Sequence, residues 1–152
     1  MKKLVILFLG IFLISGCSCS KDEDTLVMVT EAGFAPYEYY ENNEIVGVDV
    51  DIAREIAAAM GKELVIKDVA FDSIINEVKS GKADFGAAGI SYSDERAEEV
   101  DFTINYTTSK QIVIVKDNSN ITIDNLDNLR IAVQLGSVGD NYVTKNYPNA
   151  KV

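Results

Sequence analysis

An alternation of apolar strands and helical segments constrains the fold more than any other feature of this chain. Three short apolar runs that are typical of buried parallel strands cover residues 25–30, 63–68 and 83–88. Segments with helical periodicity or helix-start signals cover residues 49–60, 72–80 and 93–99. Strands that are connected by helices pair in parallel through right-handed crossovers. The fold class is therefore predicted to be α/β, with a parallel sheet.

The first predicted helix starts at Asp49 as its N-cap and stops at Gly61. Its apolar stripe consists of Ile52, Ile56 and Met60, beside two alanines, and this stripe is expected to face the core. A hairpin is predicted over residues 37–48. Later in the chain, a strongly apolar run predicts a strand at 111–115, and further signals predict a strand at 130–133, a helical turn at 124–128, a helix capped by Ser137, and another strand from 150.

The N-terminus has the pattern of a secretory signal. A basic head precedes an apolar run, residues 4–14, that is too short at about 1.5 Å per residue to cross a hydrocarbon core of about 30 Å. Ile14-Ser-Gly-Cys17 directly after it resembles the bacterial lipobox, in which the cysteine is lipidated. We therefore predict a lipoprotein signal peptide over residues 1–16, lipidation at Cys17 and a tether over 17–24. The alternative is a plain signal with a chance cysteine.

Composition excludes several classes of function. The chain has no histidine, and its two cysteines are Cys17 and Cys19, so Ser-His-Asp and Cys-His catalysis are excluded and metal or redox sites lose most of their ligands. Of the 14 Lys and Arg residues, two lie in the leader, which leaves 12 against 24 acids. Such an acidic surface repels nucleic acid. No cofactor, metal or nucleic-acid partner is expected.

The turn after the third strand is the strongest candidate site. A turn that begins with the small residues Ala88 and Gly89 leads to Ser93, which is a good N-cap for a short helix. The carboxyl end of a parallel strand next to a helix start is where open α/β sheets bind ligands and anions. Arg96 can reach back over this turn and offer a planar fork to a carboxylate. The alternative is a surface loop with a solvated arginine.

Several motifs resemble the family 3 solute-binding proteins, the extracytoplasmic receptors of polar amino-acid ABC importers. The motifs are Phe34-Ala-Pro-Tyr, Val46-Gly-Val-Asp-Val-Asp-Ile, Phe71, Ala88-Gly-Ile-Ser-Tyr-Ser-Asp-Glu-Arg and Asp101-Phe. The similarity extends from about residue 25 to 140. It implies a periplasmic-binding-protein-like type II fold, with a complete or nearly complete first lobe over 25–112 and the hinge and start of a second lobe over 113–152. It also implies an ABC permease as partner and a lipid-anchored, extracytoplasmic location at the bacterial membrane.

The resemblance implies how the first lobe holds the backbone of an amino acid. Arg96 would take the α-carboxylate, assisted by the backbone or hydroxyl of Ser91. The carbonyl of Ala88 or Gly89 would receive the α-ammonium. Asp49 is interpreted as a helix cap and is left outside the site.

The resemblance also implies how the ligand side chain is held. Phe34 and Phe71 would wall the pocket, for which core packing is the alternative, and Glu31 would contact a polar or cationic group. The second lobe would contribute Gln134, Gly136 and Ser137. The identity of the amino acid is left open, with a slight preference for a cationic or amide side chain.

The length of the chain departs from the family pattern. Residues 116–152 are fewer than the roughly 40 at which a unit can support its own core, so we expect a C-terminally truncated receptor with half its site and an exposed sheet edge. Micromolar amino-acid binding by residues 17–152 would contradict this expectation. Alternative functions are an arogenate or prephenate dehydratase that uses Glu31, a sensor ectodomain and a non-functional remnant.

Overall fold

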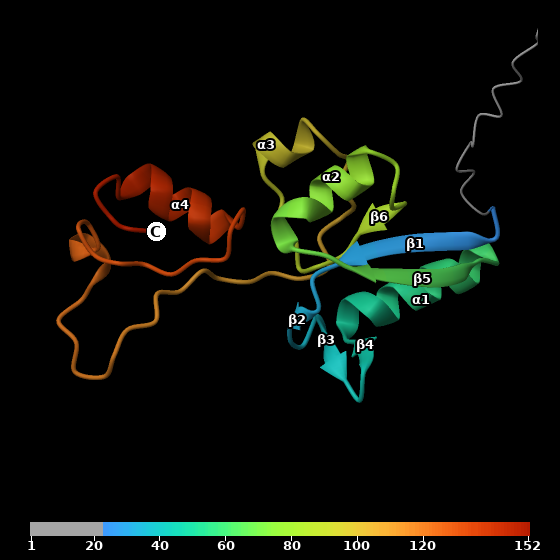
Figure 1. Ribbon diagram of the computed structural model, residues 1–152, viewed down its shortest axis with the longest axis horizontal. Coiled ribbons are helices and arrows are strands. Elements are labelled where there is room, and N and C mark those ends of the chain that lie inside the picture. Colours follow the sequence, from blue (N-terminus) through green and yellow to red (C-terminus); the bar gives the residue numbers. More distant parts are fainter. Residues whose placement is uncertain (1–22) are drawn as a thin grey trace, which may run out of the picture.

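A computed structural model describes residues 23–152. Figure 1 shows two units joined by a long extended connection. The first unit extends from β1 (Thr25–Thr30) to α3 (Asp94–Ala97), and the second contains η2 (Ile123–Asn125) and α4 (Val138–Asn146). The predicted signal peptide, the lipidation site at Cys17 and most of the tether lie outside the described residues. In the described part of the chain, no helix has the length and apolarity of a membrane span.

The first unit is built on a parallel three-stranded sheet, as the sequence predicts. Its strand order is β5-β1-β6, with β1 at Thr25–Thr30, β5 at Glu63–Asp68 and β6 at Phe85–Gly86. The third strand is thus much shorter than the predicted range of 83–88. The predicted hairpin forms from β3 (Glu38–Glu41) and β4 (Glu44–Val46), beside the two-residue strand β2 (Gly33–Phe34).

Strand β1 is buried on both faces, because helices cover the sheet on both sides. Val27 and Val29 pack with Ile74 of α2 (Ile74–Lys79), which follows the 3-10 turn η1 (Phe71–Ser73). Met28, between them, points to the other face and packs with Val50 of α1 (Val48–Met60). This two-sided core holds the carboxyl end of the sheet, where the candidate site lies, in a fixed position.

Helix α1 differs from its prediction at its start and in its buried face. The N-cap is Gly47, and Asp49 is the second residue of the helix, 1% exposed, so its assignment as a cap is wrong. The buried face contains Val50, Ala53 and Ala57, whose small side chains allow close approach to the sheet. Gly61 ends the helix in the left-handed conformation, as predicted.

The stripe formed by Ile52, Ile56 and Met60 was expected to face the core, and this expectation is wrong. These side chains are 38%, 43% and 54% exposed. The two isoleucines line an apolar groove of about 640 Å³ beside β6, an edge strand of the sheet among the described residues. The second predicted helix also differs: η1 replaces its first turn, and Asp72 makes no capping bond there.

The connection from residue 101 to 122 has no regular secondary structure, so the strand predicted at 111–115 is wrong. Its apolar side chains are exposed, with Ile112 at 76% and Ile114 at 87%. A strand needs a hydrogen-bonded neighbour, and within residues 23–152 none pairs with this segment. The strand predicted at 130–133 is reduced to one bridge, in which Arg130 pairs with Lys151.

Candidate functional site

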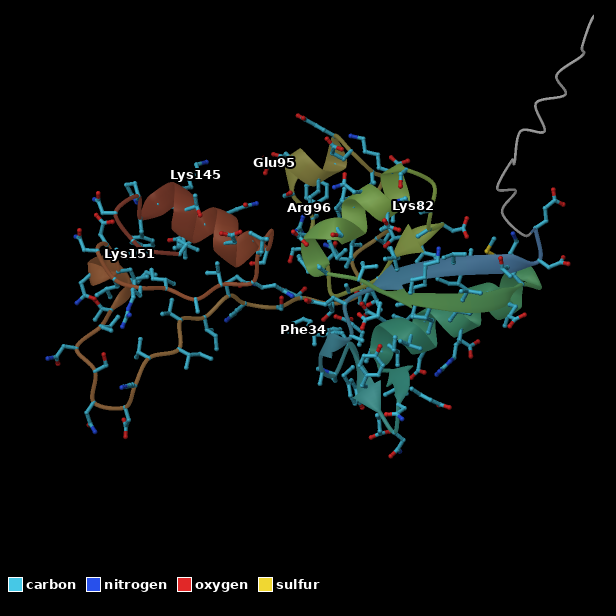
Figure 2. The ribbon with its side chains drawn as sticks, viewed as in Figure 1. Phe34, Lys82, Glu95, Arg96, Lys145 and Lys151 are labelled. Atoms are coloured by element: carbon cyan, nitrogen blue, oxygen red, sulfur yellow. The ribbon has the colours of Figure 1, made fainter. Side chains whose placement is uncertain are left out.

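Arg96 is positioned by a short capped helix at the edge of the first unit. Helix α3 (Asp94–Ala97) begins after Ser93, whose hydroxyl accepts a hydrogen bond from the Arg96 backbone N–H at 3.2 Å. This confirms the predicted cap. Figure 2 shows Arg96 on the side of the first unit that faces α4. The cap therefore fixes where the arginine side chain starts.

The guanidinium of Arg96 joins the two units. Its Nη1 donates to the Ser91 carbonyl at 2.6 Å, and its Nη2 donates to the Gly136 carbonyl of the second unit at 2.9 Å. Its Cζ lies 5.6 Å from the centroid of the Phe71 ring, a cation–π distance. The side chain is half-buried, and burial lowers its pKa. A small cavity of about 80 Å³ adjoins this cluster. Because a guanidinium has five N–H donors, it retains donors for an anion.

The turn at Gly136 comes close to the first unit and is held by an acid that sequence analysis missed. The Gly136 backbone N–H donates to Asp140 Oδ2 at 2.9 Å, and the Ser137 hydroxyl accepts from the Asp140 N–H at 3.1 Å. Gly136 has φ +73°, and a Cβ there would lie 3.1 Å from that of Asp72. Ser137 is therefore the N-cap of α4, as predicted. The Gly136 N–H is engaged with the Asp140 carboxylate.

A second contact between the units joins two predicted site residues. The side-chain amide of Gln134 donates to Oε2 of Glu31, which follows β1. Together with the bond between Arg96 and Gly136, it places polar groups of both units around the carboxyl end of the sheet. Two predicted site residues of the second unit, Gln134 and Gly136, thus contact predicted site residues of the first unit.

Phe34 and Gly89 form another part of the predicted site. The Phe34 ring is 49% exposed and stacks on Tyr37, with centroids 5.3 Å apart, so it is not part of the core. Gly89 has φ +54°, and a Cβ there would lie 3.0 Å from the Phe34 ring. Ala88 is 2% exposed and packs in the core with Val27, Val29 and Ile74. The positive φ and the close approach of the ring both favour glycine at this position.

A buried acid behind this turn was missed because it resembled a helix cap. Asp49 Oδ2 accepts hydrogen bonds from the Gly89 N–H at 2.8 Å and the Tyr106 hydroxyl at 2.9 Å. Its position at the start of a predicted helix favoured the cap in sequence analysis. Within residues 23–152 no cluster of His, Cys, Asp and Glu has the arrangement of a metal site.

Sequence comparison places this chain in a family of known proteins. The sequence profile of the bacterial extracellular solute-binding proteins, family 3, matches residues 26–151. The arginine-binding extracellular protein ArtP of Bacillus subtilis (strain 168) is 33% identical over 147 residues, which cover 91% of this chain and 58% of ArtP. The chain thus spans less than two thirds of the length of this relative.

Solved structures give the same result. An ancestral arginine-binding protein bound to arginine superposes with a TM-score of 0.79 at 36% identity, over 85% of this chain and 59% of that one. An ancestral amino acid-binding protein that is a precursor of cyclohexadienyl dehydratase has a TM-score of 0.75 at 29% identity, over 84% and 59%. These matches confirm the periplasmic-binding-protein-like α/β fold. The chain belongs to the bacterial extracellular solute-binding proteins, family 3.

Proposed function

We propose that this chain is the substrate-binding component of an extracytoplasmic amino-acid ABC importer, and that it binds a polar amino acid between its two units. The observation that carries the proposal is the Arg96 guanidinium, which bridges the Ser91 and Gly136 carbonyls across the two units. A planar cation with spare donors at this junction suits an α-carboxylate. A ligand bound there would contact both units, so its binding would favour closure.

The proposed ligand class is a cationic or amide amino acid. Phe34 offers an exposed ring, and Glu31 offers a carboxylate at the junction of the units. Such groups attract a positively charged side chain. Two compared proteins, ArtP and the ancestral structure, bind arginine according to their names. We therefore choose L-arginine as the first probe, with L-histidine and L-glutamine as alternatives.

The dehydratase alternative has weaker support. General acid–base catalysis needs a second proton-transfer group beside Glu31. The group that contacts its carboxylate is the amide of Gln134, which does not titrate near neutral pH. The superposed precursor of a dehydratase is itself described as an amino acid-binding protein. The binding role is therefore the one that we propose.

The role of Arg96 can be tested with a ligand that lacks the carboxylate. We expect L-arginine to bind at least tenfold more tightly than agmatine, its decarboxylated form, because hydrogen bonds between charged groups contribute about 1.5–3 kcal/mol. Arg96→Met should bind both ligands with similar, weak affinity. NMR titration of residues 17–152 measures weak and tight binding alike.

Arg54→Met is the matched control, because Arg54 is an exposed arginine of α1 that pairs with Asp51. This variant should keep the preference for L-arginine. Retention of that preference in Arg96→Met would contradict the assignment of Arg96 to the carboxylate. Absence of binding for all three amino acids would contradict the proposed function of this chain.

Attachment to the membrane through Cys17 is part of the proposal. Its support is the lipobox-like Ile14-Ser-Gly-Cys17 after an apolar run, together with the extracellular character of the family. Acyl chains contribute about 0.8 kcal/mol per buried CH₂, so two chains give durable anchoring. In bacterial cells, labelled fatty acid should enter the wild-type protein and not Cys17→Ser. Equal labelling of the two proteins would exclude Cys17 as the lipidation site.

A further inference from the structure

A pair of buried carboxyl groups lies directly behind the candidate site. Glu38 of β3 and Asp49 of α1 are each 1% exposed. Glu38 Oε2 and Asp49 Oδ1 are buried, and within residues 23–152 neither atom has a hydrogen-bond partner. Unpaired buried carboxylate oxygens are costly, so such a pair in a folded core calls for an explanation.

One proton held between the two carboxyl groups would satisfy both oxygens. Burial, the neighbouring Asp49 and the charge of Glu31 raise the pKa of Glu38 to about 9. Glu38 therefore carries a proton at neutral pH and can donate it toward Asp49. The hydroxyls of Tyr106 and Tyr37, which lie near these acids, add no positive charge. The Asp49 carboxylate is thereby left to accept hydrogen bonds with its other oxygen.

The second oxygen of Asp49 connects the Gly89 turn with the connection between the two units. Asp49 Oδ2 accepts from the Gly89 N–H at 2.8 Å, in the turn that lies under the Phe34 ring. The same atom accepts from the Tyr106 hydroxyl at 2.9 Å, on the connection that leads to the second unit. Burial and the Asp49 charge raise the pKa of Tyr106, so this hydroxyl keeps its proton.

We propose that Asp49 is a positioning residue, which fixes the Gly89 turn and links it to the interunit connection while Glu38 supplies the proton that satisfies its other oxygen. The assignment of the turn to a ligand rests on the proposed function; the positioning itself does not. Movement of the connection would then alter the same carboxylate that holds the ligand turn. Asp49, which was predicted to cap helix α1, is thus assigned instead to holding the Gly89 turn.

Amide hydrogen exchange at Gly89 tests the positioning without any ligand. We expect Asp49→Ala to speed exchange of the Gly89 amide at least tenfold at neutral pH, because the variant removes a charged acceptor. Asp49→Asn keeps an acceptor oxygen and can donate to Glu38, so it should restore much of the protection. Asp51→Ala, an exposed acid of the same helix, is the control and should leave Gly89 unchanged. Unchanged exchange in Asp49→Ala would overturn the proposal.

A second measurement needs no variant, in case Asp49→Ala fails to fold. In the wild-type protein, an NMR coupling across the hydrogen bond should connect the Gly89 amide nitrogen with the side-chain carboxyl carbon of Asp49. Its absence, while couplings across the bonds between β1 and β5 are observed, would overturn the proposal.

Arginine titration then tests the link to the site. Tyr106→Phe should keep Gly89 protection but weaken L-arginine binding severalfold, because the connection is no longer tied to the turn. Unweakened binding would overturn the proposed link between turn and connection. If the wild-type protein binds no amino acid, the proposed function fails, while the exchange and coupling data still decide the role of Asp49.

Discussion

Glu38→Gln is expected to remove most of the loss of stability that the wild-type protein shows as the pH rises from about 4.5 to about 9. In the folded protein, burial and the neighbouring Asp49 raise the pKa of Glu38 from 4.5 to about 9. Within this window the folded state holds a proton that the unfolded state has lost. Folding then takes up a proton, so the free energy of unfolding falls as the pH rises.

The size of the effect follows from proton linkage. One proton difference changes the free energy of unfolding by up to about 1.4 kcal/mol per pH unit. The stabilising effect of the proton is complete below pH 4.5, the unfolded pKa, and is lost as the pH passes about 9, the folded pKa. A glutamine cannot ionise, and its amide can donate to Asp49 at every pH. The variant should therefore gain stability over the wild-type protein as the pH increases.

Urea denaturation at pH 5, 7 and 9 measures this dependence. The matched control is Glu41→Gln, an exposed glutamate of the same strand β3, which should keep the wild-type pH dependence. A Glu38→Gln protein whose stability falls with pH as steeply as that of the wild type would show that Glu38 is not the group responsible.

Met28→Ala is expected to lower the free energy of unfolding by about 2–5 kcal/mol. Met28 is fully buried in the central strand β1 and packs against Val50 and Ala53 of α1. Removing its thioether chain leaves a cavity that a parallel sheet held on both faces cannot easily close. This loss is a large share of the 5–15 kcal/mol that typically stabilises a domain.

Met60→Ala provides a control with the same chemical change at the other end of the burial range. Met60 is 54% exposed at the end of α1, so its replacement should change the free energy of unfolding by less than about 0.5 kcal/mol. Urea denaturation of both variants at one pH gives the comparison. Equal effects of the two substitutions would contradict the assignment of the core to the β1–α1 interface.

The order of elements in the first unit could be predicted because each depends on local patterns. The continuous apolar run of β1 indicated a strand buried on both faces, and Val27, Met28 and Val29 divide between the two faces as a strand requires. Gly61 ends α1 through its own left-handed backbone, and Ser93 caps α3 through its own hydroxyl. These predictions needed no knowledge of distant contacts.

The predictions that failed depended on distant neighbours. Residues 111–115 have strong strand propensity, but no strand within residues 23–152 pairs with them. Helix α1 has apolar residues on more than one face, and only its packing on the sheet decides that Ala53 and Ala57 are inside and Ile52 is outside. Hydrophobic periodicity gives the number of apolar faces and not which face is buried.

The turn that carries Arg96 shows which features could be predicted from the sequence and which could not. The residue types from Ala88 to Arg96 predicted a capped helix start with a cation beside it, because capping and side-chain reach are local properties. The contact of Arg96 with Gly136, 40 residues later, and the hold of Asp49 on Gly89 exist only in the folded protein. Hydrogen bonds between distant residues depend on the path of the whole chain, which no local pattern encodes.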